Sequence, residues 1–277
     1  MTIKNHYIPC FWAAYWNFDY LNSKRTIIDH KDIVREKTIF VLNLRINKIL
    51  KTTTENVFFE KKSGIAKVTP DTTLDFENIF SIMEEAYKDN LESVILSNKI
   101  IDEESKALLT SFIVYQTLRH PNMLNSMTEF YKTAGLEKYQ MLLSLKAKLS
   151  NPNEMLNLFA PILVPKWTIY KLNKNVFPLS DCPILGRNKH LMIALAPNIM
   201  LEIFLDRATS KIEPCIVKNR ISYFKYRKFI RRTIYNSSRE IIFGSLELLE
   251  DIQKSCIYSK HLKKVKWNVS KSSNRIV

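Results

Sequence analysis

Residues 175–186 read N-V-F-P-L-S-D-C-P-I-L-G, and this stretch decides the fold expected for the C-terminal half of the chain. Its apolar first part leads Ser180 and Asp181 into a turn, because Pro183 fixes its own φ angle and keeps Cys182 out of the helical region. A second apolar stretch follows. We therefore predict a buried strand that ends where Asp181 begins a turn. The Asp181 carboxylate then either faces a cleft or accepts hydrogen bonds from its own downstream backbone.

Other short segments of strand character surround this stretch. They are rich in β-branched and aromatic residues and are separated by prolines, which is typical of strands joined by turns. Together they predict a small antiparallel or mixed sheet in the C-terminal half, and one earlier segment also has strand character. The segments are 167–172, 176–180, 191–196 and 199–205, with 37–44 as the earlier one.

The middle of the chain is predicted to be helical. Apolar residues recur there at helical spacing, and the second helix should end just before Pro121. A basic helix, broken near Gly244, closes the chain. The fold class is therefore α+β, mostly helical, in a single domain over 1–277, with 1–150 mainly helical and 151–277 holding the sheet and the basic helix if the domain has lobes. The predicted helices cover 74–96, 103–118, 122–133, 136–149 and 221–249.

Composition excludes several common classes of protein. The chain has four glycines and contains neither G-x-x-x-x-G-K-S/T nor G-x-G-x-x-G, so Walker-type nucleotide hydrolysis and the standard dinucleotide fingerprint are excluded. Its four cysteines form no C-x-x-C pair, which favours a reducing compartment over a disulfide framework. No signal peptide and no apolar run of about 18 residues is present. We expect a cytoplasmic protein without a membrane partner.

The net charge of +15 is unevenly distributed. Residues 205–277 hold 17 Lys or Arg against 6 Asp or Glu, a surplus of 11 positive charges. Residues 71–104 hold 10 acidic against 2 basic residues, a surplus of 8 negative charges. The basic third favours a polyanion partner such as nucleic acid. One alternative is that it packs beside the acidic helix of the same chain, and another is that the high pI reflects an AT-rich genome that favours Lys.

Four motifs in order along the chain resemble those of one family. They are N-H-Y-I-P-C-F at 5–11, F-I-V-Y-Q-T-L-R-H-P at 112–121, S-D-C-P at 180–183 and the segment 236–243, which resembles a closing helix. The chain thus resembles the bacterial domain-of-unknown-function family 4238, although Cys10 and Cys182 stand where Gln and Asn are usual. The resemblance implies a bacterial or phage-borne intracellular protein and supplies no reaction.

Five polar residues are candidates for catalysis. An imidazole acts as base, acid or metal ligand, and a carboxylate beside it orients the ring, so His6 and Asp181 form the candidate pair and the candidate ligands of a divalent metal. Arg119 either clamps a phosphate or closes a structural ion pair with Asp181, Glu84 or Glu85. On the last helix, Asn236 and Arg239 would share one face with Arg232 and Glu240. The five candidates are His6, Arg119, Asp181, Asn236 and Arg239.

The last helix also interleaves aromatic and basic residues. Such a surface stacks on bases and neutralises phosphates, but an amphipathic helix that buries its aromatics gives the same pattern. The candidate nucleic-acid contacts are Lys225, Arg227, Lys228, Arg231 and Arg232.

Two functions follow from these candidates. The first is a hydrolase that acts on nucleic acid or a nucleotide phosphodiester, with a role in phage defence or as a toxin. The second is a non-catalytic nucleic-acid-binding or regulatory protein that uses the basic C-terminal third.

Overall fold

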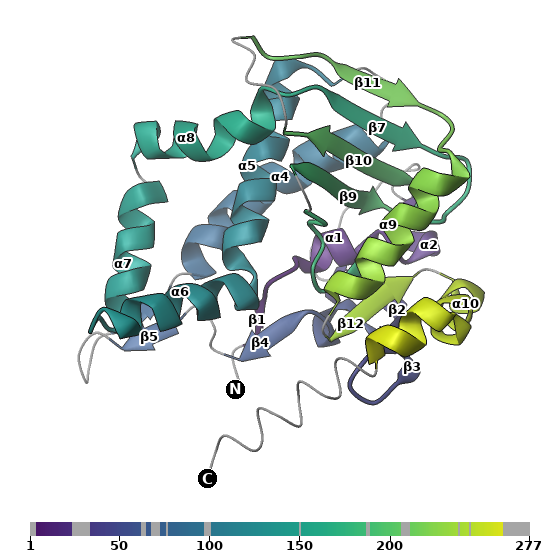
Figure 1. Ribbon diagram of the computed structural model, residues 1–277, viewed down its shortest axis with the longest axis horizontal. Coiled ribbons are helices and arrows are strands. Elements are labelled where there is room, and N and C mark those ends of the chain that lie inside the picture. The colour runs from purple at the N-terminus through teal and green to yellow at the C-terminus, as the bar shows by residue number, and fades with distance from the viewer. Residues whose placement is uncertain are drawn as a thin grey trace. The chain divides into compact units, whose positions relative to one another are not determined.

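The computed structural model describes residues 4–23, 34–61, 65–67, 73–75, 77–96, 101–149, 151–186, 189–205, 211–237, 239–243 and 245–262 (Figure 1). The chain is α+β and mostly helical, as predicted. It groups into two compact units, each built from three stretches of sequence. Unit 1 comprises Met1–Pro9, Phe59–Trp167 and Ile203–Ile216, and unit 2 comprises Cys10–Phe58, Thr168–Glu202 and Val217–Val277. Whether the chain counts as one domain stays a prediction.

Unit 1 is dominated by helices, which account for the acidic and central parts of the sequence. Asp102 caps α5 by accepting a hydrogen bond from the Ser105 backbone N–H at 2.8 Å, and α5 ends where Pro121 begins the next helix. Two short antiparallel strand pairs, β1 with β4 and β5 with β6, complete the unit. The helices are α4 (Glu77–Leu96), α5 (Glu103–Arg119), α6 (Pro121–Thr133), α7 (Lys138–Leu149) and α8 (Pro152–Leu163); the strands are β1 (Lys4–His6), β4 (Phe59–Lys61), β5 (Ile65–Lys67) and β6 (Thr73–Asp75).

A buried lysine anchors α5 within unit 1. Lys106 is 2% exposed, and its ammonium donates to the backbone carbonyls of Pro165 at 2.8 Å and Glu213 at 2.7 Å. Its Nζ also lies 5.3 Å from the centre of the Trp167 ring. Carbonyl dipoles and the ring face thus replace the water that the charge would otherwise hold. Burial nevertheless lowers the pKa of Lys106 from 10.5 to about 8.

In unit 2, Leu179–Ser180 of the stretch 175–186 form the edge strand of an antiparallel sheet of order β3-β2-β12-β8. The central strand β12 places Ile241 opposite Leu42 on one side and opposite Ser180 on the other. A core cluster that includes Leu42, Ile241 and Leu249 packs α10 onto this sheet. The elements are β2 (Thr38–Asn43), β3 (Lys48–Thr53), β8 (Leu179–Ser180), β12 (Glu240–Phe243) and α10 (Leu246–Lys254).

A second four-stranded sheet has the order β11-β7-β10-β9. Its strands β7, β9 and β10 confirm the sheet predicted in the C-terminal half, and their residues are almost fully buried in the strand interiors. Two tryptophans near the N-terminus donate their indole N–H groups to backbone carbonyls. Trp12 of α1 donates to Leu195, and Trp16, in the turn after α1, donates to Phe177. The elements are β7 (Trp167–Lys171), β9 (His190–Ala196), β10 (Ile199–Phe204), β11 (Cys215–Lys218), α1 (Cys10–Ala14), α2 (Phe18–Ser23) and the 3-10 turn η1 (Thr54–Asn56).

The predicted closing helix over 221–249 is wrong. Helix α9 covers Tyr223–Asn236 only, strand β12 follows, and α10 is a separate helix. The segment 236–243 is therefore not the end of a helix. Ile241 is 0% exposed and fills the centre of a sheet, so long-range pairing with β2 and β8 overrides the local helical pattern.

One helix and one helix boundary also differ from the predictions. Residues 152–163 form α8, which was not predicted although Asn151 caps it and Pro152 stands in its first turn. The helix predicted from residue 74 begins at Glu77, because residues 73–75 pair with β5 instead.

Replacing Lys106 by Met should destabilise the protein by about 2–4 kcal/mol, because two buried carbonyls lose their donors. Urea unfolding followed by far-UV circular dichroism measures this difference. Lys132→Met is the matched control on exposed α6, and it should change the unfolding free energy by less than about 0.5 kcal/mol.

The same variant tests the lowered pKa of Lys106. Between about pH 8 and pH 10.5 the unfolded chain holds the Lys106 proton and the folded chain does not. The unfolding free energy of the parent protein relative to Lys106→Met should therefore rise with pH across this window. A difference that is flat or falls with pH contradicts the assigned environment of Lys106.

Candidate functional site

Two of the predicted catalytic residues lie in unit 1. His6 ends β1, pairs with Phe59 and holds its ring 6.0 Å from the Phe59 ring, between the centroids. Arg119 ends α5, is 5% exposed and forms an ion pair with Glu84 of α4. This pair is one of the structural alternatives that the sequence left open for Arg119. Its burial leaves little of the guanidinium surface for a ligand.

The other three predicted catalytic residues lie in unit 2. Asp181 directly follows β8 and is 1% exposed, and its Oδ2 accepts a hydrogen bond from the Arg239 backbone N–H at 2.9 Å. The structure therefore brings Asp181 and Arg239 together. Asn236 is the exposed last residue of α9. Because His6 and Arg119 belong to unit 1, their convergence with Asp181 stays a prediction.

The helix face predicted to carry Arg232, Asn236, Arg239 and Glu240 does not exist. Helix α9 ends at Asn236, and Glu240 is the first residue of β12. In this strand, Glu240 accepts a hydrogen bond at 2.9 Å from the backbone N–H of Phe58, a residue with φ of 53°. Burial and the charge of Asp181 raise the pKa of Glu240 above its ordinary value.

Asp181 and Glu240 thus form a pair of carboxyl groups that interact electrostatically, and sequence reasoning missed this pair. The pairing of β8 with β12 creates it, since the Asp181 N–H donates to the Glu240 carbonyl at 3.0 Å. Burial, with the charge of Asp181 as a smaller contribution, also raises the pKa of the neighbouring Cys182 to about 12. Cys182 therefore remains a neutral thiol near neutral pH, which argues against a nucleophilic role.

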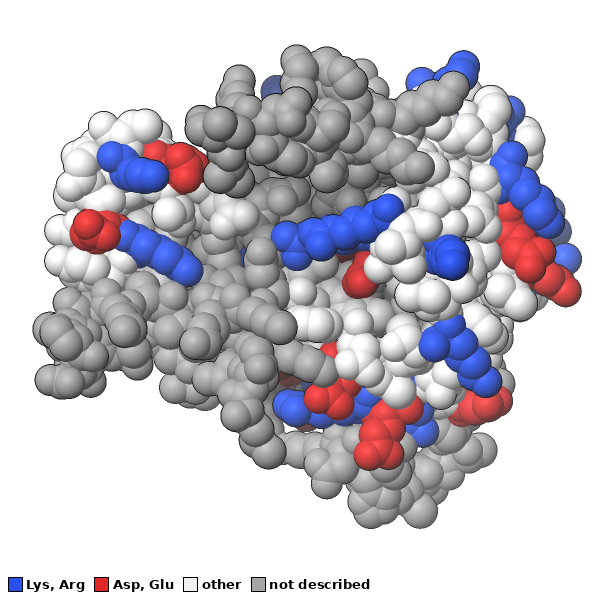
Figure 2. Space-filling view, turned by 90° about the horizontal axis from the view of Figure 1, so that it is seen from below, with Lys and Arg blue, Asp and Glu red and all other residues white. Residues whose placement is uncertain are grey.

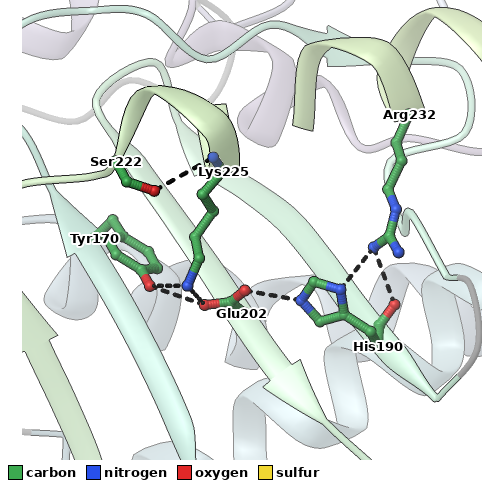
Figure 3. A network of polar contacts seen from close by, with 6 residues as sticks. All are labelled: Tyr170, His190, Glu202, Ser222, Lys225 and Arg232. Carbon is green, nitrogen blue, oxygen red and sulfur yellow. Dashed lines mark hydrogen bonds and ion pairs between the residues drawn. The ribbon is translucent and has the colours of Figure 1, made fainter. Parts of the chain in front are cut away.

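A buried polar network holds α9 against the sheet of β7, β9 and β10 (Figure 3). At its centre is Glu202 of β10, which is 1% exposed. Its Oε2 accepts hydrogen bonds from the Lys225 ammonium at 2.6 Å and from the Tyr170 hydroxyl at 2.8 Å. Burial alone would raise the pKa of Glu202, but these two hydrogen bonds and the Lys225 charge lower it. Glu202 is therefore ionised and paired.

The network continues through His190 of β9. Arg232 of α9 donates to His190 Nδ1 at 3.0 Å and to the His190 carbonyl at 3.3 Å. Because Nδ1 accepts, Nε2 carries the proton and donates to Glu202 Oε1 at 2.8 Å. Burial is the main reason that the pKa of His190 is lowered, so the ring is neutral near neutral pH. Lys225 and Arg232, one near each end of α9, are thus bound to the sheet.

Six exposed side chains of α9 form what we call its outer face, and one of them, Lys228, borders the side bound to the sheet because it lies three residues after Lys225 and four before Arg232. Arg227 lies over the Tyr223 ring at 5.6 Å, and Arg231 lies over the Tyr235 ring at 5.4 Å. Among the described residues, neither arginine nor Lys228 forms an ion pair with a carboxylate. The exposed fractions of Tyr223 and Phe224 are 73% and 80%. The outer face comprises Tyr223, Phe224, Arg227, Lys228, Arg231 and Tyr235.

The structure therefore divides the five predicted nucleic-acid contacts into two groups. Lys225 and Arg232 are bound to Glu202 and His190, whereas Arg227, Lys228 and Arg231 are exposed, although the charge of Glu202 still acts on Lys228. On the face of the molecule drawn in Figure 2, basic and acidic side chains of the described residues are interspersed. The candidate interface consequently rests on the local geometry of α9 and not on net charge alone.

Within the part of the chain that the structure describes, no three His, Cys, Asp or Glu side chains are grouped so that they could hold a metal ion. No described helix has the length and apolar character needed to cross a bilayer.

Fold and site together define an α+β protein with a basic, aromatic helix anchored on a buried glutamate. A family model described as "Protein of unknown function (DUF4238)" matches residues 4–246. The chain belongs to this family, and the resemblance read from its four motifs is confirmed. Neither a curated protein nor a solved structure matches the chain.

Replacing Glu202 by Gln should destabilise the protein by about 2 kcal/mol at neutral pH, because the Lys225 cation loses its buried counter-charge. The control is Glu247→Gln on exposed α10, which should change stability by less than about 0.5 kcal/mol. Urea unfolding measures both variants.

The pH dependence of this difference has a fixed sign. The folded-state pKa of Glu202 lies below its ordinary value of 4.5, so its stabilising contribution is complete above pH 4.5 and is lost as pH falls through the folded-state pKa. The difference in unfolding free energy between the parent protein and Glu202→Gln should therefore become smaller as the pH falls below 4.5. If this difference in unfolding free energy stays constant below pH 4.5, Glu202 is not the ionised centre of the network.

Proposed function

We propose that the protein binds single-stranded nucleic acid through the outer face of α9. The observation that carries this proposal is that one helix exposes two aromatic rings together with three cations that form no ion pair with a carboxylate among the described residues. The sequence predicts this function as the alternative to a hydrolase.

The cations supply the attraction for phosphate. Helix α9 contains no Asp or Glu, so no charge on the helix itself neutralises Arg227, Lys228 or Arg231. Successive cations along one helix face can follow a phosphate backbone and release its condensed counterions. The two arginines also present planar guanidinium groups, which suit bidentate contacts with phosphate oxygens.

The aromatic rings favour a single strand over a duplex. Tyr223 and Phe224 expose most of their surface, which costs free energy in water unless a partner covers it. Unstacked bases cover such rings by stacking, and each stacked base contributes about 1–3 kcal/mol to binding. Bases inside a duplex are already stacked on one another and are not available for this contact.

The network of Figure 3 supports binding by fixing the helix in advance. Lys225 and Arg232 hold the inner side of α9 to Glu202 and His190. The backbone that carries the outer cations is therefore ordered before a ligand arrives, which reduces the entropy lost on binding.

Replacing Arg227, Lys228 and Arg231 together by Gln should weaken binding to a labelled oligothymidylate at least about tenfold, because the phosphates lose their cations. Fluorescence anisotropy at several salt concentrations measures the affinity. The slope of log affinity against log salt should flatten by about two, at about 0.7 per lost phosphate contact.

The matched control removes the same charge elsewhere in unit 2. Lys48, Lys51 and Lys174 are exposed and lie outside α9, and their replacement by Gln should leave most of the affinity intact. Equal losses in the two triple variants would show that net charge, not the outer face, drives binding. Absence of binding by the parent protein would refute the proposal directly.

Hydrolysis of a phosphodiester is the second candidate, and the carboxyl pair of Asp181 and Glu240 supports it. Two interacting carboxyl groups with different environments can divide the roles of acid and base, and the pKa of Glu240 is raised while Asp181 accepts an N–H donor. The active atoms under this proposal belong to Asp181 and Glu240, with His6, Arg119, Asn236 and Arg239 as the remaining sequence-derived candidates.

Asp181→Asn tests the hydrolase candidate with little expected change in fold, since the Asn oxygen can still accept the Arg239 N–H. Release of fragments from an end-labelled oligonucleotide should cease in this variant and persist in the exposed control Asp19→Asn. Full activity of Asp181→Asn, or no cleavage by the parent protein, would eliminate this candidate.

A further inference from the structure

A small groove lies between α9 and α10, beside the outer face. Its volume is about 220 Å³, below the range typical of sites for drug-sized ligands and suited to one planar group. Its walls combine aromatic and aliphatic side chains, among them Tyr226, Ile230 and Leu248. One acidic and one basic side chain, Asp251 and Arg227, also line it. The groove is thus apolar with two opposite charges in its lining.

The groove and the outer face of α9 share two residues. Tyr223 and Arg227 line the groove and also belong to the outer face. A strand that follows the cations of α9 therefore passes the mouth of the groove. From there a single unstacked base can enter between the two helices.

Asp251 supplies the polar group that would recognise this base. Within the described part of the chain its carboxylate takes part in no hydrogen bond or ion pair. Asp251 and Tyr226 both line the groove, and the charge of Asp251, after burial, raises the pKa of the Tyr226 phenol. An ionised carboxylate only accepts hydrogen bonds, so it selects a base edge that donates.

From this geometry we infer that the groove between α9 and α10 binds one guanine base of a single strand. The Watson–Crick edge of guanine presents two adjacent N–H donors, N1–H and the N2 amino group, which match the two carboxylate oxygens of Asp251 as an arginine fork does. Adenine and cytosine place an acceptor nitrogen beside their amino group, and uracil or thymine flanks its one donor with two carbonyls. Each of these arrangements turns an acceptor toward the carboxylate.

The inference rests on the proposed nucleic-acid function and adds its base preference. A strand fits better than a free guanine nucleotide, because Lys228 and Arg231 continue along α9 beyond the groove, whose lining does not include them. These two cations have phosphates to contact only if the ligand is longer than one nucleotide.

Anisotropy titrations with two oligonucleotides of about fifteen residues test the inference. One is all thymidylate and the other carries a single central guanine. The parent protein should bind the guanine-containing strand about tenfold more tightly, as a bidentate contact gives. Inosine, which lacks the 2-amino group, should lose most of this gain, whereas 7-deazaguanine, which keeps both donors, should retain it.

Asp251→Asn should abolish the preference for guanine while it leaves binding to oligothymidylate in place. Glu247→Gln removes one negative charge from the same helix and should keep the preference. If the parent protein binds both strands equally, the guanine pocket is refuted and the proposed function stands. If it binds neither strand, the proposed function fails as well. Competition by free guanosine monophosphate as strong as that of the strand would refute the strand as the occupant.

Discussion

The ion pair of Glu202 with Lys225 is the interaction on which the arrangement of unit 2 depends. A carboxylate that is 1% exposed must find donors, and Glu202 finds them on three other elements, namely Tyr170 on β7, His190 on β9 and Lys225 on α9. Because an unpaired charge in this position would cost several kcal/mol, the helix cannot rotate or shift without a large penalty. The network therefore fixes which side of α9 faces the sheet.

This constraint divides the charge of the helix by role. Lys225 and Arg232 neutralise and orient buried groups, and the exposed cations of α9 meet solvent beside exposed rings. The surplus of positive charge in the C-terminal third is thus not one uniform feature. Part of it is structural, and only the outward part is available to a polyanion.

Much of the fold was predictable because its signals are local. Asp102, Pro121 and helical periodicity define α5 and its neighbours, and Pro183 marks the turn after β8. Strand β12 was not predictable, since its pairing with β2 and β8 joins residues far apart in sequence. The Asp181–Glu240 pair was missed for the same reason. Glu202 gave one overlooked signal, because a charged residue inside the apolar run 199–204 requires buried partners.

Photo-cross-linking of an iodouracil-substituted single strand, followed by mass spectrometry of the adducts, tests the central claim most directly. The account predicts adducts on Tyr223 or Phe224 of α9 in the parent protein. It also predicts their loss when Glu202 is replaced, because the helix then no longer presents its outer face in a fixed orientation. Adducts confined to other elements, with α9 unmodified, would contradict the account.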